Sequence, residues 1–145
     1  MAYWLWGDAA AEHVVVCAHG LSRQGRDFDV LARALLACAG AQGRPLRVIC
    51  PDVVGRGHSD WLKDPMGYQF STYVGDMLAL LGALQGAGPI RSFDWVGTSM
   101  GGLIGLTLAG VPELPLPALL HRLVLNDVGP VIEWAALQRI GQYLG

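Results

Sequence analysis

The segment from Ser92 to Val111 limits most strongly how this chain can fold. It reads S-F-D-W-V-G-T-S-M-G-G-L-I-G-L-T-L-A-G-V, so the pattern G-x-S-x-G lies between a short apolar run and a longer apolar run rich in small residues. This order predicts a strand, a sharp turn at Ser99 and a helix. The turn strains the backbone of Ser99, and Gly97 and Gly101 leave room for the strand and the helix to approach each other.

Ser99 is the first candidate for chemistry. It is expected to project from the carboxyl end of the strand at the amino terminus of the helix, where free N–H groups and the helix dipole favour a developing anion. A serine hydroxyl becomes reactive when a neighbouring base takes its proton. We therefore predict that Ser99 is a catalytic nucleophile; the alternative is a small residue at a tight turn. The backbone N–H of Met100 is then expected to be half of an oxyanion hole.

Composition favours a single domain built around a buried sheet. The chain has 145 residues, 52% of them hydrophobic, and a mean hydropathy of +0.38, which suits parallel strands that are apolar on both faces. Ten basic and twelve acidic residues give a net charge of −2 without charge blocks, so neither nucleic acid nor a membrane surface is an expected partner. The oligomeric state is left open.

The first residues lack the basic segment of a signal peptide, and the longest apolar stretch, 100–111, is too short to span a bilayer. A cytoplasmic protein is therefore expected. The cysteines Cys17, Cys38 and Cys50 are odd in number and lie in apolar runs without C-x-x-C spacing. They are interpreted as small buried hydrophobic residues in a reducing compartment, and neither a metal nor a cofactor is expected.

Strand patterns alternate with helix patterns along the chain. Such alternation predicts βαβ units and an α/β fold, with a mostly parallel sheet covered by helices on both faces. The expected strands are Ala2–Trp6, His13–Ala18, Leu46–Cys50, Phe93–Val96 and Leu123–Asn126. Helices are expected from Asp27 to about Gly40, from Ser71 or Thr72 to about Gly86, after Ser99, and from Ile132 to Gly145, with a loop at Pro112–Pro117.

Several polar segments directly follow expected strands. They are His19-Gly20, the loop Asp52–Ser59, Ser99 and Asp127. Ligands of parallel sheets bind at the carboxyl ends of the strands, so these segments are expected to cluster along one edge of the domain. His13 and His121 precede their strands and are expected at the opposite edge, away from the chemistry, and His58 is expected to be a turn or rim residue.

Four motifs together resemble the α/β-hydrolase superfamily, in particular its bacterial serine hydrolases. They are H-G-L-S at 19–22, D-V-V-G-R-G-H-S at 52–59, G-T-S-M-G-G at 97–102 and L-V-L-N-D-V-G-P at 123–130, in the order found in the family. The resemblance implies an esterase-like Ser-His-Asp hydrolase that acts on small-molecule esters, or less often on amides, lactones or carbon–carbon bonds. It also implies that the second N–H of the oxyanion hole belongs to Leu21.

The same resemblance predicts that this chain is an amino-terminal portion of a longer hydrolase. In the family the histidine follows the last strand, and the acid usually follows the strand after the one that ends at Asn126; the chain stops at Gly145, before either position. Residues 1–130 are then part of the hydrolase core, 131–145 resemble the start of a cap, and the chain alone is expected to be inactive. A non-catalytic ligand-binding domain and a fragment without independent function are the alternatives.

Two further residues are candidates for the catalytic triad. His19 could act as the base, because its strand is expected to lie beside that of Ser99, but the resemblance gives His19 and Gly20 a loop-shaping role. Asp127 is a candidate acid, or else a turn residue whose carboxylate caps backbone amides.

Other residues are expected to serve the structure. Asp52 is expected to fix the loop around Gly55 and Gly57 through hydrogen bonds to backbone N–H groups, and Asp94 to have a structural partner. A further set of large side chains is expected either to line an acyl pocket or to belong to the core: Trp61, Met66, Tyr68 and Phe70.

Overall fold

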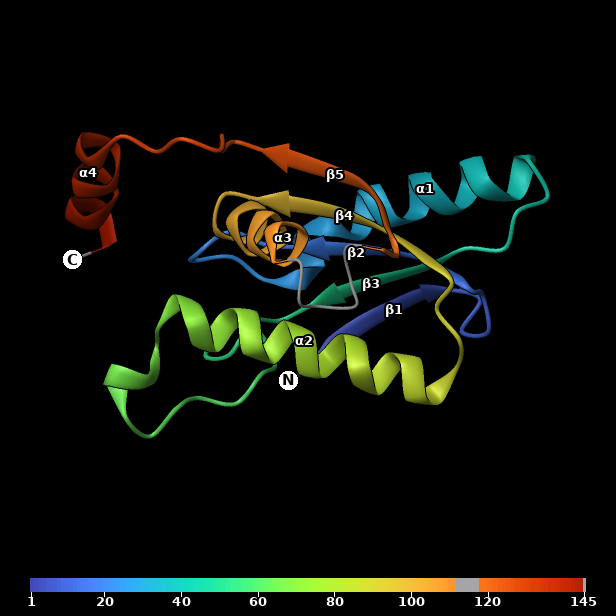
Figure 1. Cartoon of the computed structure of the whole chain (residues 1–145), viewed down its shortest axis with the longest axis horizontal. Helices are drawn as coiled ribbons and strands as arrows, with labels where there is room; N and C mark the ends of the chain where they lie inside the picture. The colour runs from blue at the N-terminus through green and yellow to red at the C-terminus, as the bar shows by residue number, and fades with distance from the viewer. Residues whose placement is uncertain (112–117, 145) are drawn as a thin grey trace.

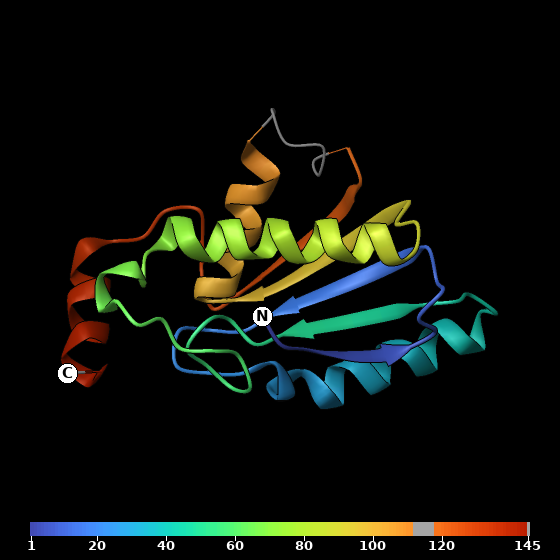
Figure 2. The same cartoon turned by 90° about the horizontal axis from the view of Figure 1, so that it is seen from below.

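Five strands form one sheet that lies between helices (Figures 1 and 2). The structure, a computed structural model, describes residues 1–111 and 118–144. The expected loop at Pro112–Pro117 lies outside the described residues. The elements in chain order are β1 (Tyr3–Gly7), β2 (His13–Ala18), the 3₁₀ turn η1 (Gly25–Phe28), α1 (Asp29–Ala41), β3 (Arg47–Pro51), the 3₁₀ turn η2 (Pro65–Gly67), α2 (Phe70–Ala87), β4 (Ser92–Thr98), α3 (Met100–Gly110), β5 (Leu120–Asn126) and α4 (Trp134–Leu144).

The sheet has the strand order β1-β3-β2-β4-β5. β3, β2, β4 and β5 run parallel to one another, and β1 pairs antiparallel with β3 at the edge. The predicted α/β fold with a mostly parallel sheet is therefore confirmed. Because the four parallel strands end at the same edge of the sheet, the loops that follow them meet there.

Helices cover both faces of the sheet. Figure 2 shows α1 on one side and α2 with α3 on the other. Alternate side chains of β2 divide between the two layers: Val14 and Val16 pack in the core under α2 and α3, and Val15 and Cys17 pack in the core under α1. β2 is therefore apolar on both faces, as expected of a central strand in a parallel sheet.

Two cysteines fit the prediction of buried residues and one does not. Cys17 and Cys50 are buried under α1, and their neighbourhood raises the pKa of the Cys50 thiol through its hydrogen bond with Cys17 and through burial. Cys38 is exposed. The prediction was wrong there because Cys38 lies on the outer face of α1, where an apolar sequence context says little about which way a helical side chain points.

The predicted boundaries are least accurate around β5 and α4. β5 begins at Leu120, three residues before the expected start, because its pairing with β4 extends back to Phe93. The polar pair His121-Arg122 hides this extension in the sequence. α4 begins at Trp134 and lies beyond the end of β5, away from the layered part of the molecule (Figure 1). That this helix starts a cap stays a prediction.

Helix α3 packs against the sheet with almost no space between the two backbones. A β-carbon on Gly97 would lie 2.4 Å from the carbonyl of Gly101, and a β-carbon on Gly101 would lie 2.1 Å from the carbonyl oxygen of Ala18 in β2. The indole N–H of Trp95, under the helix, donates a hydrogen bond of 2.9 Å to the Gly101 carbonyl. The glycines on both sides of Ser99 therefore permit the close approach that the sequence predicts.

We expect Gly101→Ala to lower the free energy of unfolding by about 1–3 kcal/mol or more, because the added methyl group meets backbone atoms that cannot move aside. Chemical denaturation measures this change. Gly75→Ala in α2 is the matched control: its methyl group would meet nothing within 4 Å, and alanine should raise the stability by about 0.5–1 kcal/mol. Equal stability of the two variants would contradict the close packing of α3.

Candidate active site

Ser99 occupies the turn between β4 and α3 in a strained conformation. Its φ is 49° and its ψ is −114°, a region that residues with side chains rarely adopt and that costs about 1–3 kcal/mol. The turn is held because the Ser99 N–H donates to the Asn126 carbonyl at 2.9 Å and its own carbonyl accepts from Gly102 and Leu103. The Ser99 hydroxyl does not cap the helix, so it is not consumed by the backbone that carries it.

The loop after β2 runs directly past Ser99. A β-carbon on Gly20 would lie 3.6 Å from the Ser99 β-carbon. Leu21 follows Gly20 in this loop, and Met100, the first residue of α3, follows Ser99. The N–H of a first helical residue has no partner within its own helix, so the Met100 N–H is free of α3 hydrogen bonding.

His19 is buried, and both of its ring nitrogens are hydrogen bonded. Nε2 accepts from the Val53 N–H at 3.0 Å, so the proton sits on Nδ1, which donates to the Gly20 carbonyl at 2.7 Å. Burial lowers the pKa of His19 and keeps the ring neutral. The imidazole thus joins the loop after β2 to the loop after β3, and no nitrogen is left to take a proton from Ser99.

The carboxylate of Asp52 makes a second link between the same two loops. It is fully buried, and it accepts hydrogen bonds from the N–H of Gly25 at 2.7 Å and from the N–H of His58 at 2.9 Å. Gly57, with φ at 53°, packs directly on the carboxylate. The expectation that Asp52 fixes the glycine loop is confirmed.

Arg56 makes the third link, and sequence reasoning missed it. Its Nε donates to the Leu21 carbonyl at 2.9 Å, and one terminal nitrogen donates to the Val54 carbonyl and to the hydroxyl of Tyr73. The guanidinium also lies over the ring of Tyr73, 5.0 Å from its centroid. The only signal in the sequence is an arginine between two glycines, in a loop that follows a buried strand.

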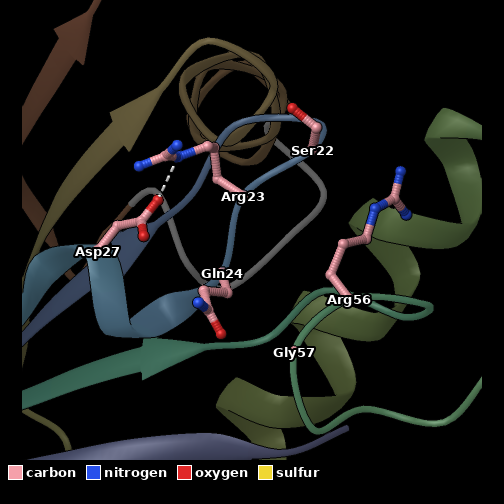
Figure 3. Close-up of a pocket in the computed structure, with 6 residues that line it drawn as sticks. All are labelled: Ser22, Arg23, Gln24, Asp27, Arg56 and Gly57. Carbon is pink, nitrogen blue, oxygen red and sulfur yellow. Dashed lines mark hydrogen bonds and ion pairs between the residues drawn. The ribbon is translucent and has the colours of Figure 1, made fainter. Parts of the chain in front are cut away.

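A hollow of about 390 Å³ opens beside these loops. Figure 3 shows Arg23 on one side of it, reaching toward Asp27, and Arg56 on the other, with Ser22 and Gln24 between them. The Nε of Arg23 lies 2.6 Å from the carboxylate of Asp27. The lining is therefore polar and carries two guanidinium groups and one carboxylate.

Asp127 lies at the carboxyl edge, directly after β5, with φ at 56°. Its carboxylate is exposed and makes no hydrogen bond within residues 1–111 and 118–144. In the described part of the chain, the Asp127 carboxylate therefore does not cap backbone amides. Its use as the triad acid stays a prediction.

The remaining histidines make no hydrogen bond to Ser99 in the described part of the chain. His13 hydrogen bonds to Ser92 and lies 3.3 Å from Asp94, at the amino edge of the sheet, and His121 stands next to it. Asp94 thus has the structural partners that the sequence predicts, and they are His13 and Arg122. The prediction that His13 and His121 lie at the edge opposite to Ser99 is confirmed. His58 is exposed and packs edge-on against Trp4.

The large side chains after the glycine loop differ in burial. Trp61, Met66 and Phe70 are exposed by 76%, 73% and 40%, so the interpretation as core was wrong for these three. Their loop and the start of α2 lie at the open carboxyl edge, where nothing described covers them. Tyr68 is half-buried and accepts a hydrogen bond from the Leu62 N–H. That the set lines an acyl pocket stays a prediction.

No three metal-ligating side chains come together in the described part of the chain. Within the same residues, every helix is too short or too polar to cross a membrane.

A family model described as alpha/beta hydrolase fold matches residues 13–143. The chain belongs to the alpha/beta hydrolase fold family. An alpha/beta hydrolase from Novosphingobium aromaticivorans has a similar structure, with 41% identity and a TM-score of 0.78 over 97% of this chain and 44% of that chain. A thioesterase domain from the curacin biosynthetic pathway has 27% identity and a TM-score of 0.71 over 98% of this chain and 47% of that chain.

Among curated alpha/beta hydrolase relatives, the 3-hydroxybutyrate-oligomer hydrolase of Cupriavidus necator is 51% identical over 145 residues. The match covers 100% of this chain and 44% of that enzyme. The chain thus spans less than half the length of this relative.

We expect the stability of the fold to fall as the pH drops below 6.5, the ordinary pKa of histidine. Because burial lowers the pKa of His19, the unfolded chain binds a proton in this window that the folded chain does not. Stability therefore rises with pH until about 6.5. Chemical denaturation at a series of pH values should show that His19→Gln loses less free energy of unfolding below pH 6.5 than the unmodified protein. In the control His58→Gln, which removes an exposed ring, the free energy of unfolding should fall with pH as in the unmodified protein. If it also does so in His19→Gln, His19 is not the source of the acid loss.

Proposed function

We propose that this protein is a serine hydrolase of carboxylic esters with Ser99 as its nucleophile. The observation that carries the proposal is the strained turn at Ser99, which presents a hydroxyl that does not cap α3 and has no backbone partner in the described residues. Strain at a non-glycine residue persists where the surrounding structure enforces it, and such positions cluster at active sites.

In the proposed reaction the Ser99 oxygen bonds to the ester carbonyl carbon while its proton passes to a base. The carbonyl oxygen becomes a tetrahedral oxyanion, and the N–H groups of Leu21 and Met100 are proposed to donate to it. The carbon–oxygen bond to the alcohol then breaks, and the alcohol oxygen takes the proton from the base. Water attacks the acyl-enzyme by the same steps and releases the acid and Ser99.

The proposed donor Leu21 lies in a loop that other residues of the site hold in place, and Met100 is fixed as the first residue of α3. The Leu21 carbonyl accepts the hydrogen bond from Arg56, and the neighbouring Gly20 carbonyl accepts the one from His19. Donors fixed before reaction stabilise a developing oxyanion without reorganisation, and losing one such donor costs about 10²–10³ in rate.

We propose that the base comes from outside the described residues. All four histidines lie within them, and each has the contacts given above rather than one with Ser99. The proposal is consistent with the 44% coverage of the Cupriavidus enzyme. The acid is proposed to lie outside as well, with Asp127 as the candidate within the chain.

The proposed substrates are short esters of hydroxy acids. The support is the relative at 51% identity, which is a 3-hydroxybutyrate-oligomer hydrolase. A domain of similar fold at 27% identity is a thioesterase, which also fits an enzyme that cleaves an ester-type bond.

We expect Ser99→Ala to reduce kcat/KM for a 3-hydroxybutyrate dimer by on the order of 10⁴- to 10⁶-fold, in the protein expressed from its complete gene. Release of 3-hydroxybutyrate measures the rate. Ser92→Ala, at the opposite edge of the sheet, should keep the rate of the unmodified protein. Turnover that survives Ser99→Ala would exclude the proposed nucleophile.

A fluorophosphonate probe, located by peptide mass spectrometry, tests where the base resides. We expect label on Ser99 in the product of the complete gene and little or none in the 145-residue chain alone. Stoichiometric label on the 145-residue chain would show that a base is already present in it. Absence of label and of turnover in both would favour a ligand-binding domain without catalysis.

A further inference from the structure

We propose that the hollow lined by Arg23 and Arg56 binds a carboxylate on the alcohol part of the substrate. The inference rests on the proposed ester hydrolysis at Ser99 and narrows it to esters whose leaving alcohol is itself a hydroxy acid. The hydrolase would then cut the ester bond nearest the free carboxyl end of a short oligomer.

The hollow lies close enough to Ser99 for one small substrate to reach both. The β-carbon position of Gly20 lies 3.6 Å from the Ser99 β-carbon and 3.7 Å from the Arg23 γ-carbon, so the nucleophile and the stem of Arg23 flank the same glycine. Only a short chain of atoms separates the scissile carbonyl from the carboxylate in a β-hydroxy acid ester. The fragment is therefore placed across Gly20, with its ester at Ser99 and its carboxylate at Arg23.

The charges of the hollow favour an anion. Arg23 is paired with Asp27, but Arg56 directs its hydrogen bonds to neutral oxygens, namely two carbonyls and a tyrosine hydroxyl. Within residues 1–111 and 118–144 no carboxylate lies within ion-pair distance of Arg56. Arg56 thus has no ion-pair partner in the described part of the chain, and it contacts the loop that passes Ser99.

The remaining lining suits a carboxylate rather than an apolar group. Ser22 and Gln24 lie between the two arginines and add neutral hydrogen-bond donors (Figure 3). Guanidinium groups bind carboxylates through parallel N–H donors, and these charge-assisted bonds are about twice as strong as neutral ones. An uncharged alkyl alcohol would gain none of these bonds.

The arrangement also assigns sides to the substrate. The carboxylate in the hollow belongs to the part that leaves as alcohol, so the first product released is a hydroxy acid. The acyl part then binds on the side of Ser99 that faces away from the hollow. An ester whose carboxylate lies in its acyl part should therefore gain nothing from Arg23.

The test compares two esters that differ in one charge: the 3-hydroxybutyrate dimer with a free carboxylate, and its methyl ester. In the product of the complete gene, we expect kcat/KM for the free acid to exceed that for the methyl ester by on the order of tenfold, in line with a pair of charge-assisted hydrogen bonds. Arg23→Gln should lower this preference by raising KM for the free acid, because one of the two guanidinium groups of the hollow is lost. The side chain of Arg23 is 65% exposed, so the replacement should not disturb folding.

Two matched variants define the charge effect. Asp27→Asn removes the counter-charge of Arg23 and should increase the preference for the free acid. Arg33→Gln, an exposed arginine of α1 that does not line the hollow, should leave the preference unchanged. A succinate monoester, with its carboxylate in the acyl part, should respond to none of these substitutions.

The outcomes separate this inference from the proposed function. Turnover of both esters with a preference that Arg23→Gln and Asp27→Asn leave unchanged would overturn the carboxylate site and keep the hydrolase. A succinate monoester that loses its rate in Arg23→Gln would overturn the assignment to the alcohol side. Calorimetry with 3-hydroxybutyrate on Ser99→Ala gives a readout independent of turnover: binding weakened by Arg23→Gln supports the site, and binding that is absent or unaffected overturns it.

Discussion

The contact between α3 and the sheet is the constraint on which the site depends. With a glycine on each side of Ser99, the helix backbone reaches the backbone of β2, and the chain can turn from strand to helix within one residue. That turn gives Ser99 its unusual φ and points its side chain to the edge where the parallel strands end. A wider separation would let the turn relax, and the serine hydroxyl would become available to cap the helix.

Around this turn, the loops after β2 and β3 are joined by two buried side chains, His19 and Asp52, and by the half-buried Arg56. His19, Asp52 and Arg56 each hydrogen bond to backbone groups across the gap between the loops. A buried donor or acceptor that loses its partner costs about 1–3 kcal/mol, so such a network favours one arrangement of the loops strongly over others. The backbone beside Ser99 is thereby fixed before any substrate arrives.

The sequence predicts those parts of the fold that depend on local pattern. The strand–turn–helix order around Ser99, the parallel sheet and the carboxyl-edge loops each follow from periodicity and from glycine placement. The direction of Cys38, the early start of β5 and the exposure of Trp61 depend on what lies beside them in space, and periodicity carries no such information. The same holds for the candidate site: the role of Arg56 appears only when the Leu21 carbonyl is seen next to it.

The packing of Gly57 on Asp52 has a consequence for how this protein can change during evolution. A side chain at position 57 would need the space that the carboxylate occupies, and a shorter residue at position 52 would leave the N–H groups of Gly25 and His58 without an acceptor. Neither position can drift alone. Positions 52 and 57 should therefore vary as a pair across homologous sequences, while the exposed Arg23 nearby remains free to diverge with the substrate.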